Sequence, residues 1–203
     1  MILTSHTGPA PRFTADIFPS QAAYARRLGI PYQIHRDGGH AFEHRVPAIL
    51  AHPAEVTLYL EWDVRVADDA PDIMPLPDDA DIMLPLHTDL PHGEWLRQRV
   101  DGLEIPWHII GVMLGRREAF ERIHQHFPAC RAAAAMLPSE NARYEGAILL
   151  AIQRAGLRLA ALPGGLHEFA RRHHRAAFLH FEGETKSKLK GKKPRMTCGR
   201  TLL

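Results

Sequence analysis

The chain is poor in cysteine. Only Cys130 and Cys198 are present among its 203 residues, and they lie far apart in the sequence. Two such cysteines exclude a disulfide framework and the closely spaced ligands of a zinc knuckle. The chain also lacks an apolar run long enough to span a membrane, and its first residues lack the charged-then-apolar order of a secretion signal. We therefore expect a cytoplasmic protein without a transmembrane segment.

Acidic residues are missing from the last part of the chain. Residues 186–203 contain seven lysines and arginines and no acid, and removing these seven from the 25 basic residues leaves 18 against 23 acidic ones. Like charges in one block repel one another and resist packing. We therefore expect a single domain, residues 1–187, followed by a basic tail, residues 188–203. The tail can attract an anionic partner such as nucleic acid or a phosphopolymer, or it can simply improve solubility.

Hydrophobic segments of strand length alternate with helical patterns along the chain. With 45% hydrophobic residues, a chain of this length can bury one sizeable core. The alternation predicts an α/β protein with a mostly parallel, mixed sheet flanked by helices. The strands are expected at residues 2–5, 31–35, 56–60, 82–86, 107–114, 157–162 and 176–181, and the main helices at residues 20–28, 45–51, 93–99, 116–126 and 139–155. Ligands of such sheets bind at the carboxyl ends of the strands.

One motif lies near the end of the chain, where residues 180–186 read H-x-x-G-x-x-K. It follows an apolar run, so we expect it just beyond a buried strand. His180 can donate a ring nitrogen to a divalent metal, and Lys186 can supply a point charge for phosphate oxygens. Gly183 lets the backbone approach the phosphates closely. The pattern is typical of a diphosphate that is held by a metal.

A second, acidic motif follows the expected strand at residues 56–60. Its carboxylates, Glu61 and Asp63, are two residues apart, and in an extended segment such side chains lie on the same side. A hard cation prefers oxygen ligands of this kind and keeps substrate phosphates on its other faces. The same residues also fit a strand that simply runs into a solvated acidic loop.

Together the two motifs resemble those of nucleotide-sugar-dependent glycosyltransferases of the GT-A fold, closest in pattern to the family 8 type of glycogenin and bacterial galactosyltransferases. In that family an apolar strand ends in D-x-D, and a late H-x-x-G-x-x-K completes the metal and diphosphate site. The chain departs from the pattern at Glu61, which is one methylene longer than aspartate, and at Ile110, where the family has a small or amide residue. Further similar segments follow in the family's order at residues 20–32, 44–50, 110–118 and 144–156.

The resemblance implies a GT-A-like three-layer sandwich and an enzyme that moves a sugar from a nucleotide-diphosphate sugar, with a UDP-sugar as the expected donor, to a hydroxyl acceptor. It implies Mn²⁺ or Mg²⁺ as the cofactor. The residues that it assigns are the metal ligands Asp63, His180 and Glu61, the donor-binding residues Lys186, Gly183, Arg45 and Ser5, and the acceptor-side residues Glu145 and Asp89.

The acceptor side is the least determined part of the prediction. Transfer to a hydroxyl needs a carboxylate that accepts its proton or a group that stabilises the reacting sugar. Glu145 is our candidate, because GT-A enzymes place such an acid early in the helix before this turn, although an exposed helix acid would look the same. Glu140 is a rival that the helix dipole alone can explain, and Asp89 is a candidate for binding the acceptor. Retention and inversion of configuration both stay open.

Two other classes of function fit part of the sequence. A nucleic-acid-binding module would explain the basic tail but would leave Glu61, Asp63 and His180 without a purpose. A metal-dependent nucleotide or phosphodiester hydrolase would use the same residues. Such hydrolases need more ligands for their ions and for a nucleophilic water than these residues supply.

Overall fold

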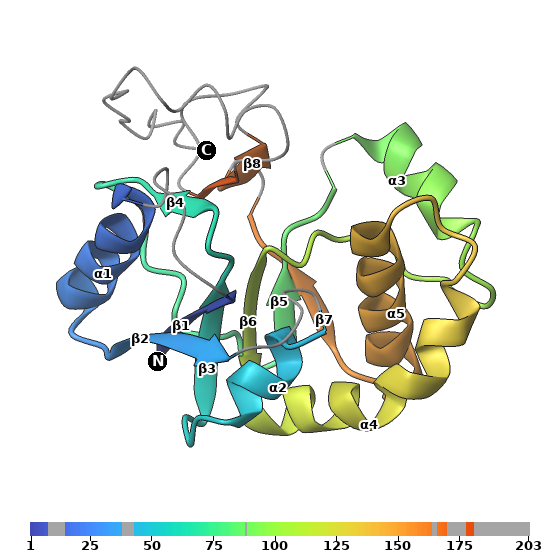
Figure 1. Cartoon of the computed structure of the whole chain (residues 1–203), viewed down its shortest axis with the longest axis horizontal. Coiled ribbons are helices and arrows are strands. Elements are labelled where there is room, and N and C mark those ends of the chain that lie inside the picture. The colour runs from blue at the N-terminus through green and yellow to red at the C-terminus, as the bar shows by residue number, and fades with distance from the viewer. Residues whose placement is uncertain (8–14, 38–42, 88, 164–165, 170–177, 181–203) are drawn as a thin grey trace.

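A central sheet organises the described part of the chain, which comprises residues 1–7, 15–37, 43–87, 89–163, 166–169 and 178–180 of a computed structural model (Figure 1). Its six strands have the order β2-β1-β3-β6-β5-β7. They are β1 (Ile2–Thr7), β2 (Tyr32–Asp37), β3 (Val56–Leu60), β5 (Ile82–Leu84), β6 (Val112–Arg116) and β7 (Leu159–Ala161). Only β6 runs against its neighbours, β3 and β5, within this sheet. The expectation of a mostly parallel, mixed sheet is therefore confirmed.

A small second sheet lies at one end of the central one, where Figure 1 labels β4 and β8. It has the order β4-β9-β8 and consists of β4 (Val64–Val66), β9 (Phe178–His180) and β8 (His167–Phe169). Strand β9 is antiparallel to β4, and the register pairs Val64 with His180. This long-range pairing brings the backbone of His180 beside the residue that follows Asp63.

Helices cover both faces of the central sheet. They are α1 (Ile17–Leu28), α2 (Arg45–Leu50), α3 (Leu90–Arg97), α4 (Arg117–Ala133) and α5 (Glu140–Arg154). Successive strand residues point to opposite faces, so Leu58 and Leu60 pack in the hydrophobic cluster that contains α1, whereas Tyr59 packs in the cluster that contains α2, α4 and α5. Two cores, one on each side of the sheet, make the predicted three-layer sandwich.

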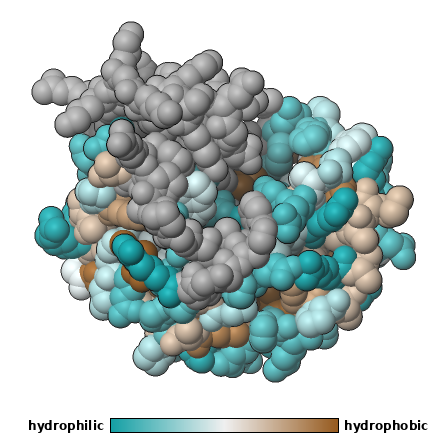
Figure 2. Space-filling model, in the orientation of Figure 1, coloured by the Kyte–Doolittle hydropathy of each residue, from teal (hydrophilic) through white to brown (hydrophobic). Residues whose placement is uncertain are grey.

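Several element boundaries differ from the expected ones. The first helix begins at Ile17, three residues earlier than expected, and α4 continues through Pro128 to Ala133. The strand expected from residue 107 begins only at Val112, and the preceding His108 makes an isolated bridge to Leu86. No helix among the described residues is long and apolar enough to cross a membrane. On the face shown in Figure 2, the described surface is mostly hydrophilic with small separate hydrophobic patches.

Helix α5 ends in a Schellman motif that aims the chain into β7. The N–H of Leu157 donates to the carbonyl of Ile152 at 3.2 Å, and the N–H of Gly156 donates to the carbonyl of Gln153 at 2.9 Å. Gly156 has a φ of 60°, in the left-handed region where a residue with a Cβ is disfavoured. The glycine is therefore required by the backbone conformation of the turn.

Replacing Gly156 with alanine is expected to lower the free energy of unfolding by about 1–2 kcal/mol, the cost of placing a Cβ in the left-handed conformation. No atom lies within 4 Å of the position that the new Cβ would take, so the loss would report backbone strain and not a clash. Urea unfolding followed by circular dichroism measures it. An unchanged unfolding midpoint would contradict the strained turn.

Candidate functional site

The acidic motif forms a β-turn, and the extended conformation expected for it is wrong. The N–H of Val64 donates to the carbonyl of Glu61 at 3.0 Å, so the chain turns directly from β3 into β4. The buried Gln21 of α1 donates its side-chain amide to the carbonyls of Glu61, at 2.9 Å, and Val64, at 2.7 Å. Asp63 lies within this turn and is 4% exposed. Its position is thus set by hydrogen bonds to the backbone on both sides of it.

The carboxylate of Glu61 is bound by Arg45. The guanidinium of Arg45, at the start of α2, donates to Oε1 of Glu61, and the two side chains are only 2% and 9% exposed. In surroundings of low polarity such a pair attracts more strongly than it would in water. Arg45 was predicted to contact the donor diphosphate, and that role stays a prediction. The ion pair itself was not predicted.

Tyr59 joins this ion pair to the end of β1. Its hydroxyl lies 2.7 Å from the hydroxyl of Ser5, the residue that was predicted to bind the donor. Burial raises the pKa of Tyr59, the charge of Arg45 and the hydrogen bond to Ser5 act against that rise, and the charge of Asp63 adds to it. Three residues that were predicted to bind the donor or the metal, Ser5, Arg45 and Asp63, therefore all influence the pKa of this buried hydroxyl.

The same arginine reaches α5. The guanidinium carbon of Arg45 lies 5.3 Å from the centre of the Tyr144 ring, within the range of a cation–π contact. Burial raises the pKa of Tyr144, so its hydroxyl stays protonated. The buried network around Arg45 thus includes Tyr144, the residue that directly precedes Glu145 in the sequence.

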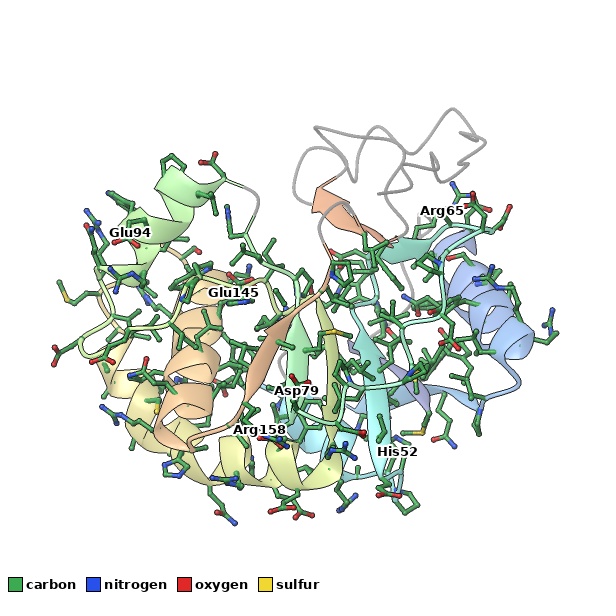
Figure 3. The ribbon with its side chains drawn as sticks, turned by 180° about the vertical axis from the view of Figure 1, so that it is seen from behind. His52, Arg65, Asp79, Glu94, Glu145 and Arg158 are labelled. Carbon is green, nitrogen blue, oxygen red and sulfur yellow. The ribbon has the colours of Figure 1, made fainter. Side chains whose placement is uncertain are left out.

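Glu145 is a buried carboxylate, so the alternative of an exposed helix acid is excluded. It is 8% exposed and lies in the half of α5 that is nearer α3, as Figure 3 shows. The indole N–H of Trp107 donates to its Oε2 at 3.3 Å, and the side-chain amide of Asn141 donates to its Oε1 at 3.5 Å. The two donors orient the carboxylate within the protein.

A cavity of about 170 Å³ lies beside Trp107, against α3. Its walls include Leu86, His87 and Leu90, so it combines apolar surface with an imidazole. Asp89 is the N-cap of α3, and its Oδ1 accepts a hydrogen bond from the N–H of His92 at 3.2 Å. This cap accounts for an aspartate at that position. The role of Asp89 toward an acceptor stays a prediction.

The late motif is only partly described. The backbone of His180 belongs to β9, next to the acidic turn, while Gly183 and Lys186 lie outside the described residues. Among the side chains that the structure describes, no three of His, Cys, Asp or Glu gather closely enough to hold a metal ion. The carboxylate of Asp63, completed by substrate oxygens, is a ligand of the kind that Mn²⁺ and Mg²⁺ prefer.

Sequence reasoning missed an aromatic group at the same edge of the sheet. His6, at the end of β1, is buried, and its ring centre lies 5.4 Å from that of Trp62 and 6.0 Å from that of Phe18. A lone histidine after a short apolar strand gives no distinctive pattern. The sequence signal that could have found it is its place directly after Ser5, at the end of a strand where ligands collect.

No known protein family matches the chain. A stretch of 54 residues is 37% identical to trans-aconitate 2-methyltransferase of Mycobacterium marinum (strain ATCC BAA-535 / M), but it covers 26% of this chain and only 20% of that enzyme. The chain thus spans a fifth of the length of that curated relative. So short a stretch carries no argument about activity.

Solved structures are similar over nearly the whole chain. One is a glycosyltransferase involved in the glycosylation of the major capsid of PBCV-1, with a TM-score of 0.65 at 15% identity, covering 93% of this chain and 98% of that one. The chain has the GT-A glycosyltransferase fold. A second similar structure is the galactosyltransferase LgtC in complex with donor and acceptor sugar analogues. Its TM-score is 0.64 at 12% identity, and the similarity covers 94% of this chain and 95% of that one. The fold that the sequence resemblance implied is therefore confirmed.

Replacing Arg45 with methionine is expected to lower the free energy of unfolding by about 3–5 kcal/mol, because the buried carboxylate of Glu61 loses its guanidinium partner. The double variant Arg45→Met/Glu61→Leu should recover part of this loss, since both buried charges are then gone. Urea unfolding in the presence of EDTA measures both variants without a contribution from metal.

The exposed pair of Arg131 with Glu43 provides the control, since its side chains are 58% and 38% exposed. The variant Arg131→Met should cost no more than about 1 kcal/mol, as is usual for surface ion pairs. Equal losses in the free energy of unfolding for Arg45→Met and Arg131→Met would show that the buried pair stabilises the protein no more than the exposed pair does.

Proposed function

We propose that the protein is a metal-dependent glycosyltransferase, which moves a sugar from a nucleotide-diphosphate sugar to a hydroxyl acceptor. The observation that carries the proposal is the pairing of Val64 with His180. In a chain with the GT-A fold, this pairing brings the backbones of the two predicted motifs side by side at one end of the central sheet. The LgtC structure holds donor and acceptor sugar analogues, which supports a sugar donor and a sugar-binding acceptor site for this chain as well.

On the donor side, Asp63 and His180 are the proposed ligands of Mn²⁺ or Mg²⁺, and Glu61 assists directly or through water while it remains bonded to Arg45. When bound, the metal would neutralise charge on the diphosphate and help the nucleotide to leave. Of the proposed diphosphate-binding residues Lys186, Gly183, Arg45 and Ser5, the lysine would stabilise the charge that develops on the leaving nucleotide. A UDP-sugar is the expected donor.

On the acceptor side, Glu145 is the proposed catalytic carboxylate. It would accept the proton of the acceptor hydroxyl or stabilise positive charge on the reacting sugar. The hydrogen bonds from Trp107 and Asn141 hold it in one orientation, and its burial keeps bulk water away. The cavity beside Trp107 would take part of the acceptor, and Asp89 caps the helix α3 that forms one of its walls. The basic residues 188–203, outside the described chain, favour an anionic acceptor.

Replacing Asp63 with alanine is expected to abolish the part of donor binding that Mn²⁺ stimulates, because the substitution removes the proposed carboxylate ligand. Isothermal titration calorimetry with UDP-glucose and UDP-galactose, with and without Mn²⁺, measures this binding. Asp68→Ala, an exposed acid in the loop after β4, is the matched control and should bind as the parent does. Unchanged donor affinity in Asp63→Ala would reject the metal assignment.

The same donors separate the alternative functions when the products are followed by mass spectrometry. Transfer to an added acceptor supports the proposal, whereas free sugar or cleaved diphosphate without any transfer supports the hydrolase. Nucleic-acid binding that is salt-sensitive and persists in EDTA, without binding of either UDP-sugar, supports the nucleic-acid module.

Replacing Glu145 with glutamine is expected to slow transfer by about 10²–10⁴-fold, the usual contribution of an acid–base group. The amide nearly preserves the size of the side chain, so calorimetric donor affinity should stay as in the parent. Glu140→Gln, an exposed acid in the first turn of the same helix, is the control and should transfer within about a factor of two. Parent-like transfer by Glu145→Gln would exclude Glu145 as the catalytic carboxylate and leave Asp89 or Glu140 as the candidates.

A further inference from the structure

A second cavity, of about 580 Å³, lies between α4 and α5 close to the start of α2. It shares no lining residue with the cavity beside Trp107. Tyr144 lines this second cavity, whereas the next residue, Glu145, is bonded to Trp107. Successive helix residues point about 100° apart, so α5 presents the tyrosine and the proposed catalytic acid in different directions.

The floor of the second cavity is aromatic. The rings of Phe127 and Tyr144 have centroids 5.1 Å apart and are tilted by 55°. Tyr144 is buried and is held by Arg45 as well. Ala132 and Ala135, which have small side chains, line the same cavity. Such a floor can pack against an apolar ligand surface without losing conformational entropy on binding.

The rim of the second cavity is charged but balanced. It contains two arginines, Arg131 and Arg143, and two glutamates, Glu43 and Glu140. Arg131 is paired with Glu43, and the Nε–H of Arg143 donates to the carbonyl of Leu137 at 2.8 Å. An anion or a cation would meet as much repulsion as attraction at this rim. Hydroxyl groups, which both donate and accept, find partners of both kinds there.

We propose that this second cavity binds a short neutral oligosaccharide, at a site separate from the one where transfer is proposed. A sugar ring has an apolar face of C–H groups that matches the floor and hydroxyls at its edge that match the rim. The volume falls within the range of about 300–1,000 Å³ that small-molecule sites occupy. The proposal does not depend on the transferase activity, since binding here needs neither nucleotide nor metal.

Saturation-transfer NMR with maltose, cellobiose and lactose, in the absence of nucleotide and metal, tests the proposal. At least one of these probes should show transfer to its ring protons. The variant Ala132→Trp fills the cavity from an exposed position and should weaken binding about tenfold or more. Ala129→Trp is the matched control, because Ala129 is exposed on the same helix but does not line the cavity.

Arg143→Ala gives a second variant that removes rim hydrogen bonds without filling the cavity, and it too should weaken binding. Thermal unfolding checks that each variant is folded. Calorimetric binding of a UDP-sugar with Mn²⁺ should be the same in Ala132→Trp and the parent, which separates this site from the proposed donor site.

Four results would overturn the proposal. One is the absence of saturation transfer to any of the three probes. A second is equal binding by Ala132→Trp and Ala129→Trp. A third is binding that is lost only in Leu90→Lys, which alters the cavity beside Trp107. The fourth is tighter binding of glucuronic acid than of glucose, because a balanced rim should not favour an anion.

Discussion

The buried ion pair between Arg45 and Glu61 is the interaction on which the rest of the candidate site depends. Both charges are removed from water, so each is tolerated only because the other is present. Arg45 comes from α2 and Glu61 follows β3, and the pair therefore ties a helix layer to the edge of the sheet where ligands of α/β proteins bind. Tyr59 and Tyr144 are packed around the same guanidinium. Its loss would disturb several elements together.

The acidic turn is held from both faces of the sheet. Gln21, on α1, binds the backbone of the turn from one layer, while Arg45, on α2, binds the side chain of Glu61 from the other. Asp63 therefore lies in a turn whose backbone is hydrogen-bonded to Gln21 and whose other carboxylate, that of Glu61, is bonded to Arg45. Such pre-organisation is what a site needs when it acts by electrostatics, because little reorganisation remains for the moment of reaction.

Helix α5 separates two cavities of different character. Glu145 accepts a hydrogen bond from Trp107, which lines the smaller cavity, and Tyr144 forms the floor of the larger one with Phe127. One rigid helix thus supports a proposed catalytic acid and a proposed glycan platform, and Arg45 links the platform to the acidic turn. The acidic turn and the larger cavity, which are far apart in the sequence, are thus connected by one side chain.

The sequence alone determined the α/β class, the strand Val56–Leu60 to the residue and the resemblance that implied the GT-A fold, because hydrophobic periodicity and motif order are local properties. It did not determine the turn at Glu61–Asp63, since the rule for side chains two apart assumes an extended chain. Nor did it determine the partner of Arg45 or the burial of Glu145. Charged residues are exposed by default, and only contacts between distant segments, such as α2 with β3 and Trp107 with α5, decide which of them enter the core.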